Sequence, residues 1–326
     1  LRYSLDACHR APPVTLVGVR VSIRYDPRDP DDVTAMDELE LADDFDRQRP
    51  QLRAVAYRIL GSLSDADDAV EDAWLRLGRT DVEQIDSLGR WLTTVVARIC
   101  LNMLRSRRTR REQPLDGLRP EPIIDDPATG TDPEHEALLA DSVGIALQVV
   151  LDTLSPAERL AFVLHDMFAV PFDEIAAMVD RSPQATRQLA SRARRRVREV
   201  APAPDPDLTR QRAVVDAYFA AARDGDLEAL VAVLDPDVVL RAHRRDGDPL
   251  ELLGAARVAR GAMTARRFAP HVRPALVNGA AGVVAFDGDR PFAVLAFTVV
   301  GDRAVAIDVF NDPELVAKLQ IRGITA

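Results

Sequence analysis

The sequence predicts a multidomain protein in which two all-α domains are followed by an α+β domain, and three observations carry this prediction. A helical period of apolar residues runs through residues 43–112. A second helical block, residues 151–198, has clear capping signals. Beyond residue 208 the pattern changes to two helices followed by strand-like segments. A chain of 326 residues is long enough for two or three domains, each with its own core.

The composition is that of a soluble protein, with 47% hydrophobic and 29% charged residues. No apolar run approaches the roughly 20 residues that cross a bilayer, and the pattern of a secretory signal is absent from the sequence. The two cysteines, Cys8 and Cys100, are too few for a disulfide framework and have no metal-ligand spacing. We therefore expect a cytoplasmic protein without a metal or cofactor.

The first helical domain is predicted to be a bundle of three helices. One helix ends at Gly61, and a second opens at Ser64 with one apolar and one acidic face. A third helix buries residues from Trp91 to Met103 and runs out into a basic segment. Arg98 and Arg105 share one stripe of this helix, and Asn102 lies at the edge of its apolar face. A solvated bundle surface and a nucleic-acid face remain equally open for this domain.

The second helical block has the spacing of a helix-turn-helix. Its first helix opens with Ser155 as N-cap, Pro156 at the first helical position and Glu158 completing a capping box. A short helix over residues 172–179 and a four-residue turn lead to a third helix with Ser182 as N-cap.

This third helix separates by face at 100° per residue. Its inward side is predicted to hold Ala185, Leu189, Ala193 and Val197. Arg can bind guanine and Gln can bind adenine in the major groove, and the arginines that follow suit phosphates. The alternative is an ordinary helical hairpin with a solvated basic face. The outward residues are Gln184, Arg187, Gln188, Ser191 and Arg195, followed by the basic run Arg192, Arg194, Arg195, Arg196 and Arg198.

The net charge of −10 is unusual for a DNA-binding protein. The basic residues cluster at residues 105–111 and 187–198, with acidic segments between them. Such a chain should bind DNA poorly alone, so we expect a larger partner that helps to place it on DNA.

The last part of the chain is predicted to be an α+β domain. Two helices (residues 213–223 and 227–234) come first, and a further helix over residues 257–268 interrupts the strands. Gly301 and Asp302 form a hairpin signal, and we expect a curved antiparallel sheet, a form that can wrap a pocket. The predicted strands are residues 238–242, 275–277, 283–287, 293–299 and 304–310.

Composition sets the expected boundaries. The first 40 residues include one possible strand, residues 14–23, and Met36 is a plausible natural start, so this part is expected to be disordered or an upstream or added extension. Two Pro-rich stretches are expected to be linkers. The predicted segments are 1–40 (N-terminal extension), 41–113 (first helical domain), 114–135 (acidic linker), 136–200 (second helical domain), 201–207 (Pro linker) and 208–326 (α+β domain).

Three segments resemble regions 2 and 4 of extracytoplasmic-function (ECF) sigma factors of the sigma-70 family. They are SDADDAVEDAWLRL (residues 64–77), GRWLTTVVARICLNMLRSRRTRRE (89–112) and LSPAERLAFVLHDMFAVPFDEIAAMVDRSPQATRQLASRARRRV (154–197). The tail is similar to the SnoaL-like (NTF2-like) domain that is fused to one subgroup of these factors. The resemblance covers nearly everything after residue 37.

The resemblance implies promoter recognition with core RNA polymerase as partner, through the β′ clamp helices and the β flap. The acidic helix would dock on the clamp helices, and the linker, with Glu121, Asp125 and Asp126, would pass through the polymerase. The third helix of region 2 and the loop before it would hold the −10 element as single strand. The implied residues are Asp67, Asp68 and Glu71 for polymerase; Arg98, Asn102, Arg105, Arg107 and Arg108 for −10; and Gln184, Arg187, Gln188, Ser191, Arg192 and Arg195 for −35.

The sequence departs from the subgroup at three motifs. A Trp-Leu-Pro-Glu-Pro motif keeps only its Pro-Glu-Pro part, residues 120–122. An Asp-Gly-Gly-Gly-Lys motif is reduced to Asp-Gly-Asp-Pro-Leu at residues 246–250, and an Asn-Pro-Asp-Lys-Leu-like motif stands as Asn-Asp-Pro-Glu-Leu at 311–315. In the family these motifs are linked to communication between tail and sigma domains.

Three functions follow as alternatives. In the first, the chain is a sigma factor whose tail packs against the sigma domains and controls them. In the second, the tail is an enzyme of the ketosteroid-isomerase type, with His243, Asp246 and Asp308 as candidates, although none lies in a recognisable motif. In the third, the chain is a dimeric repressor with a ligand-sensing tail. An acidic docking helix and a basic helix far upstream of the helix-turn-helix favour the sigma factor.

Overall fold

The structure is a computed structural model that describes residues 30–81, 85–110, 121–128, 144–200, 205–243, 250–319, 321 and 324. The chain divides into two units, with the boundary between Arg47 and Gln48. No helix within the described ranges has the length and apolar character needed to cross a membrane. The strand predicted for residues 14–23 lies outside these ranges.

The first helical domain consists of α1 (Pro30–Leu60), α2 (Leu63–Leu77) and α3 (Leu88–Arg110). Helix α1 begins at Pro30, so residues 30–40 of the predicted N-terminal extension are helical. Gly61 ends this helix with φ of 77°. The predicted opening of the next helix at Ser64 is wrong by two residues, because the Ser62 side chain accepts the Asp65 amide at 3.3 Å. Trp91, predicted to be buried, is half-buried.

The second helical domain confirms the predicted capping. It contains α5 (Gly144–Asp152), α6 (Pro156–Phe162), the π-helical turn η2 (Val163–Met167), α7 (Phe172–Val179) and α8 (Pro183–Val200). The Ser155–Glu158 capping box is complete at the start of α6. Helix α5 packs Ala146 and Val150 against Val197 of α8. The three helices α6, α7 and α8 therefore form the predicted helix-turn-helix domain.

The tail is an α+β domain, as predicted. Its strands form one seven-stranded sheet in the order β1-β4-β5-β6-β7-β2-β3. The helical elements are α9 (Leu208–Asp224), α10 (Leu227–Ala232), α11 (Ala255–Thr264), the 3₁₀-helix η3 (Arg266–His271) and α12 (Pro313–Lys318). The strands are β1 (Ile124–Asp125), β2 (Leu234–His243), β3 (Leu250–Leu253), β4 (Val272–Val277), β5 (Ala280–Asp287), β6 (Arg290–Val300) and β7 (Arg303–Phe310).

The sheet differs from the prediction in two respects. The predicted all-antiparallel sheet is wrong, because β2 and β7 pair in parallel, with Leu240 opposite Ile307 and His243 opposite Phe310. The last strand returns beside the first strand of the tail in the same direction. In addition, β1 belongs to the segment predicted to be an acidic linker, and it pairs antiparallel with β4.

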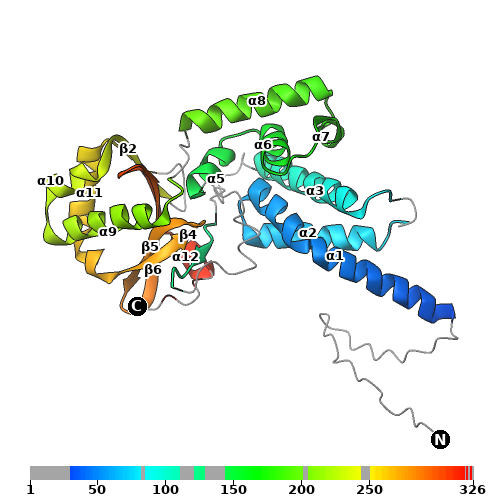
Figure 1. The fold of residues 1–326 in the computed structure, drawn as a ribbon, viewed down its shortest axis with the longest axis horizontal. Coiled ribbons are helices and arrows are strands. Elements are labelled where there is room, and N and C mark those ends of the chain that lie inside the picture. Colours follow the sequence, from blue (N-terminus) through cyan, green and yellow to red (C-terminus); the bar gives the residue numbers. More distant parts are fainter. Residues whose placement is uncertain are drawn as a thin grey trace, which may run out of the picture. The chain divides into compact units, whose positions relative to one another are not determined.

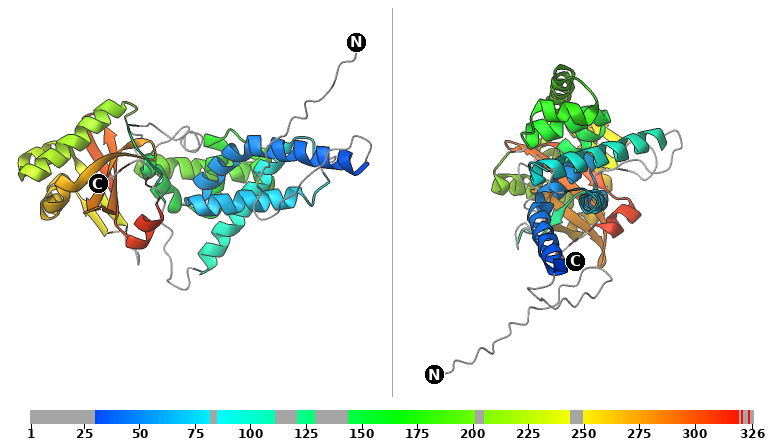
Figure 2. Two further views of the ribbon diagram at one scale, coloured as in Figure 1. Left: turned by 90° about the horizontal axis from the view of Figure 1, so that it is seen from below. Right: turned by 90° about the vertical axis from the view of Figure 1, so that its right-hand side faces the viewer.

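The two faces of the sheet pack against different partners. One face, with Val283, Phe297 and Ile307, packs against α9, α10 and α11. The other face, with Val294 and Phe310, packs against Ile124 of β1, Ile145 of α5 and α12. Figures 1 and 2 show α9 and α12 on opposite sides of the sheet. The tail thus uses its second face to bury apolar side chains of the linker and of the second helical domain.

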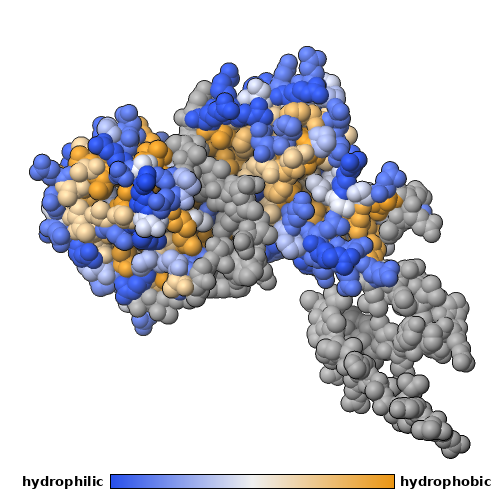
Figure 3. Space-filling view, in the orientation of Figure 1, coloured by the Kyte–Doolittle hydropathy of each residue, from blue (hydrophilic) through white to orange (hydrophobic). Residues whose placement is uncertain are grey.

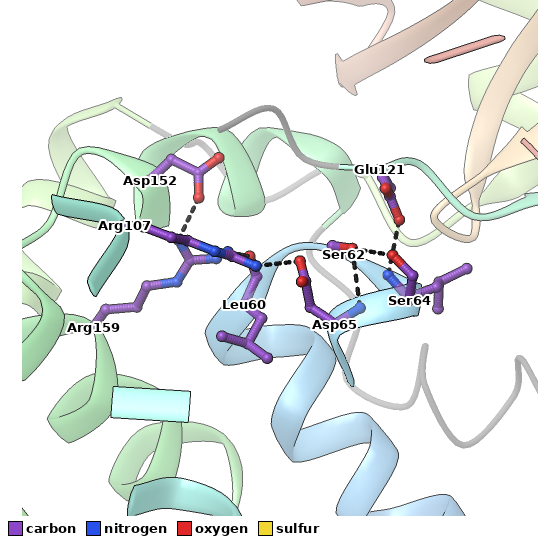
Figure 4. Close-up of polar contacts among 9 residues, drawn as sticks. Leu60, Ser62, Ser64, Asp65, Arg107, Glu121, Asp152 and Arg159 are labelled. Carbon is purple, nitrogen blue, oxygen red and sulfur yellow. Dashed lines mark hydrogen bonds and ion pairs between the residues drawn. The ribbon is translucent and has the colours of Figure 1, made fainter. Parts of the chain in front are cut away.

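Residues 121–125 are held on both sides, and we call this arrangement the linker clamp. On the side of the first helical domain, the Glu121 amide donates to the Gly61 carbonyl at 2.8 Å, and the Glu121 carboxylate accepts the Leu63 amide at 2.9 Å. Figure 4 shows Glu121 at the start of α2, beside Ser62 and Ser64. The carboxylate thus stabilises the positive end of α2.

On the tail side, Asn278 joins the clamp. Its side-chain oxygen accepts a hydrogen bond from the Ile123 backbone amide at 2.9 Å, and its backbone amide donates to the Ile123 carbonyl at 2.8 Å. The Tyr57 hydroxyl donates to the Glu121 carbonyl at 2.8 Å and accepts the Asn278 side-chain amide at 3.0 Å. Asn278 has φ of 49°, a left-handed conformation that Asn tolerates better than most residues. One tyrosine therefore links helix α1, the linker and the tail.

Replacing Tyr57 by Phe should remove both hydrogen bonds from a fully buried site. Burial raises the pKa of Tyr57 to about 12, so the hydroxyl remains a neutral donor at ordinary pH. We expect a loss of about 1–3 kcal/mol of stability. Both tryptophans, Trp74 and Trp91, lie in the first helical domain, so their fluorescence during urea unfolding measures this loss.

Tyr218→Phe is the matched control. Tyr218 is also buried, and within the described residues its hydroxyl makes no hydrogen bond, so its loss should change stability by less than about 0.5 kcal/mol. Equal unfolding midpoints for Tyr57→Phe and the wild type would contradict the role of the hydroxyl.

Candidate nucleic-acid interface

Helix α8 is placed by its cap and by the turn before it. The Ser182 hydroxyl accepts the Ala185 amide at 3.2 Å, which confirms the predicted N-cap. Asp180 ends α7 in a left-handed conformation with φ of 56°, which allows the sharp turn into α8. The N-cap therefore fixes where α8 begins, and the turn fixes its direction relative to α7.

The outward face of α8 is as predicted, whereas the inward face is shifted. The fully buried residues are Thr186, Ala190 and Ala193, and the predicted Ala185 and Leu189 are only half-buried. Hydrophilic residues gather over α8 in the space-filling view (Figure 3). The exposed residues on the face of α8 opposite its buried side are Gln184, Arg187, Gln188, Ser191 and Arg195.

Two arginines of α8 bind acids of their own domain. The Arg192 Nε atom lies 3.2 Å from Glu158, and the Arg194 guanidinium lies 2.6 Å from Asp166. Partial burial works to raise the pKa of Glu158, but hydrogen bonds from Ser155 and the charge of Arg192 outweigh it and lower that pKa. The predicted contact residue Arg192 is thus exposed but already engaged with the capping box.

The predicted −10 residues on α3 separate into different environments. Asn102 and Arg105 are exposed. Arg98 is exposed too, but its Nη2 atom donates to the Ala177 carbonyl of α7 at 3.2 Å. Arg107 turns away toward α2, where it forms an ion pair with Asp65 and donates to the Leu60 carbonyl (Figure 4). The side chain of Arg108 lies outside the described residues.

The acids of α2 also separate. Asp68 and Glu71 are exposed, whereas Asp67 binds the Arg53 guanidinium through both oxygens, at 2.5 and 3.0 Å. Leu75 is 52% exposed and lies on the same stripe as Asp68 and Glu71, since 68, 71 and 75 are one and two turns apart. Leu75 was not predicted as a site residue, because a leucine in an amphipathic helix is usually a core residue.

Acids of the linker have mixed environments. Asp125, predicted to imitate nucleic acid, is buried in β1 with 5% exposure. Glu121 is half-buried in the linker clamp, and Asp126 accepts the Ala128 amide at 2.8 Å. Neither Tyr57 nor Asn278 was predicted to matter. The Asn278-Gly279 dipeptide between two strands was the available signal for a hairpin at this point.

The candidate catalytic residues of the tail do not face its helices. His243 and Asp308 do meet, with Nε2 and Oδ1 3.0 Å apart, and the His243 ring stacks on Phe310. They therefore lie on the sheet face of Phe310, opposite α9 and α11. Asp246 lies outside the described residues. Within the described part of the chain, no group of His, Cys, Asp or Glu side chains is suited to hold a metal ion.

Comparison with known proteins agrees with this geometry. The model of sigma-70 region 2 matches residues 45–110, and that of sigma-70 region 4 matches residues 145–197. The chain is 39% identical to the ECF RNA polymerase sigma factor SigJ of Mycobacterium tuberculosis, over 82% of this chain and 91% of that protein. It is 34% identical to the probable ECF sigma factor SigI of the same species, over 83% of this chain and 93% of that protein.

A solved structure has the same arrangement of elements. The crystal structure of M. tuberculosis SigJ superimposes with a TM-score of 0.69 at 32% identity, and the match covers 86% of this chain and 100% of that chain. The match therefore includes the tail as well as both helical domains.

Proposed function

Since the chain belongs to the ECF sigma factors, which direct RNA polymerase in promoter recognition and transcription initiation, we propose how its surfaces divide this work. The first helical domain is sigma region 2, the second is region 4, and an α+β tail of NTF2-like build follows. The match to sigma region 2 is the observation that favours a sigma factor, because a helix-turn-helix repressor does not need a region 2 domain.

We propose that α8 reads the −35 element as duplex DNA. Its exposed arginines and glutamines suit base edges in the major groove, and its last turns present further arginines for phosphates. Arg192 would move from Glu158 to reach DNA. The proposed contacts are Gln184, Arg187, Gln188, Ser191, Arg192 and Arg195.

We propose that α3 and the loop before it hold the −10 element as single strand. Asn102 and Arg105 are exposed and free of ion pairs with described residues, and Arg108 follows one turn later. Arg98 joins this set once α7 moves away from it. Arg107, which the resemblance implied as a −10 contact, instead holds α2 against α3 through its ion pair with Asp65.

Docking to polymerase is proposed for the exposed stripe of α2. Asp68 and Glu71 supply negative charge toward the β′ clamp helices. Leu75, which lies nearer the end of α2, adds an apolar contact with the same helices. Asp67 contributes through its ion pair with Arg53 of α1, which holds α2 against α1. Region 4 would contact the β flap, and polymerase would thereby supply the affinity that the acidic chain lacks.

The tail is proposed to restrain the sigma domains. It binds residues 124–125 as an added strand and covers Ile145 of α5, so the linker and region 4 are both tied to its sheet. Regions 2 and 4 also pack together, through Arg98 with Ala177 and through Arg159, which donates to the Arg58 carbonyl at 3.5 Å. A linker that passes through polymerase has to leave the clamp first. Catalysis by the tail is not proposed, because His243 and Asp308 lie on the face toward the sigma domains.

Replacing Arg187 or Gln188 by Ala should cost about 1–3 kcal/mol at particular −35 base pairs and little at others. Arg198→Ala is the matched control, since this exposed arginine of the last turn should weaken binding evenly over all sequences. The measurement is transcription by the reconstituted holoenzyme from promoters with single −35 substitutions. Even weakening by all three variants would make Arg187 and Gln188 phosphate contacts.

Control by the tail is tested by in vitro transcription with core polymerase at limiting concentration. Three proteins are compared on the promoter upstream of the protein's own gene: the full chain, a version ending at Asp207, and Asn278→Ala. The last two should give more transcript, because the linker clamp is absent or weakened. Val300→Ala, at an exposed position of the same sheet, is the control. Unchanged transcription from both altered clamps would remove tail restraint from the account.

A further inference from the structure

The segment that joins α6 to α7 carries a stack of rings beneath the proposed recognition helix. The His165 ring stacks on the Phe172 ring with centroids 3.7 Å apart and planes inclined by 30°. The Arg187 guanidinium carbon lies over the same Phe172 ring, 5.6 Å from its centroid. His165 of η2 and Arg187 of α8 thus both contact Phe172 of α7.

The backbone around this stack is arranged to present His165 to Phe172. His165 lies in the π-helical turn η2, a local widening of the helix that proteins often keep at functional positions. Its Nδ1 atom is 3.1 Å from the Val170 carbonyl, so this ring nitrogen donates a hydrogen bond to it. The Val170 amide in turn donates to the Leu164 carbonyl at 2.9 Å, across Ala169 with φ of 53°. His165 is thereby fixed in position before DNA arrives.

An arginine that reads guanine needs its planar guanidinium in a defined orientation. The long side chain of an exposed arginine is mobile, and ordering it on binding costs conformational entropy. A cation–π contact with a fixed ring limits this mobility beforehand, and Arg favours such stacking through its flat, weakly hydrated guanidinium. Arg187 is exposed, so its contact with Phe172 leaves its outer edge available.

We infer that Phe172, held in place by His165, is a positioning residue that orients Arg187 for bidentate recognition of a guanine in the −35 element. The inference rests on the proposed −35 reading by α8 and adds the group that makes this reading selective. Phe172 is half-buried at the first position of α7, beside the turn of the helix-turn-helix, so its ring is itself restrained by the protein. It touches no DNA in this account.

The test uses holoenzyme assembled from core polymerase and the full chain. A promoter library with a randomised −35 element, built on the promoter upstream of the protein's own gene, is transcribed, and sequencing of the transcripts gives the base preference at each position. Arg187→Ala identifies the positions that Arg187 reads. Phe172→Leu should lower the preference at those same positions by about two- to five-fold and leave the other positions unchanged.

Two further variants separate positioning from packing. Phe172→Tyr keeps an aromatic face and should restore the preference, and Phe168→Leu changes a half-buried phenylalanine outside the stack and should have no effect on it. A base preference is a ratio within one preparation, so it does not depend on the fraction of folded protein. In the double variant Phe172→Leu, Arg187→Ala, the first substitution should have no additional effect.

The possible failures are distinguishable. No change of preference in Arg187→Ala would show that the proposed contact of Arg187 is wrong, and the inference with it. A preference lost in Arg187→Ala but intact in Phe172→Leu would overturn the inference alone. An equal effect of Phe172→Leu on all −35 sequences, with or without Arg187, would make Phe172 a packing residue and overturn it as well.

Discussion

The arrangement depends on the buried hydroxyl of Tyr57, which hydrogen-bonds the linker through the Glu121 carbonyl and the tail through Asn278. Each buried polar group at this site has its hydrogen-bond partner in a different part of the chain. No single part can therefore supply all the hydrogen bonds that these groups need. Helix α1 supplies the tyrosine, and the turn between β4 and β5 supplies the asparagine. Because an unpaired buried polar group costs more than a formed hydrogen bond contributes, the three parts are held together or released together.

This constraint holds the acidic linker in one conformation in the structure, and we propose a second one for it in the complex with polymerase. In the structure, residues 124 and 125 complete the edge of the tail sheet, and Asp125 is buried. An acidic linker that passed through polymerase in the position of nucleic acid would need the Asp125 carboxylate to be exposed. The same residues could not serve both partners at once, so competition between the tail and polymerase for this short strand is the physical basis of the regulation that we propose. The hydrogen bond from Arg98 to the Ala177 carbonyl of α7 is a second contact that would have to break if Arg98 binds the −10 element as proposed.

Local signals allowed much of the fold to be predicted, whereas the contacts between domains were beyond them. Ser155 with Glu158 and Ser182 cap helices through side chains three residues away, so sequence alone suffices. Strand β1 exists only through β4, some 150 residues later, and nothing in its Pro-Glu-Pro context announces a strand. The outward residues of α8 followed from helical periodicity. The turn of Arg107 toward Asp65 and the stack under Arg187 depend on neighbours far along the chain.

Hydrogen exchange of the backbone amides at residues 121, 123–125 and 276–278 tests the central claim most directly. These amides should be protected in the free chain, since the linker clamp holds them. Their protection should fall when core polymerase binds, while the amides of β5 and β6 in the same tail stay protected. Equal protection of the clamp in the free chain and in the holoenzyme would show that polymerase binds without releasing the linker, and would contradict the account.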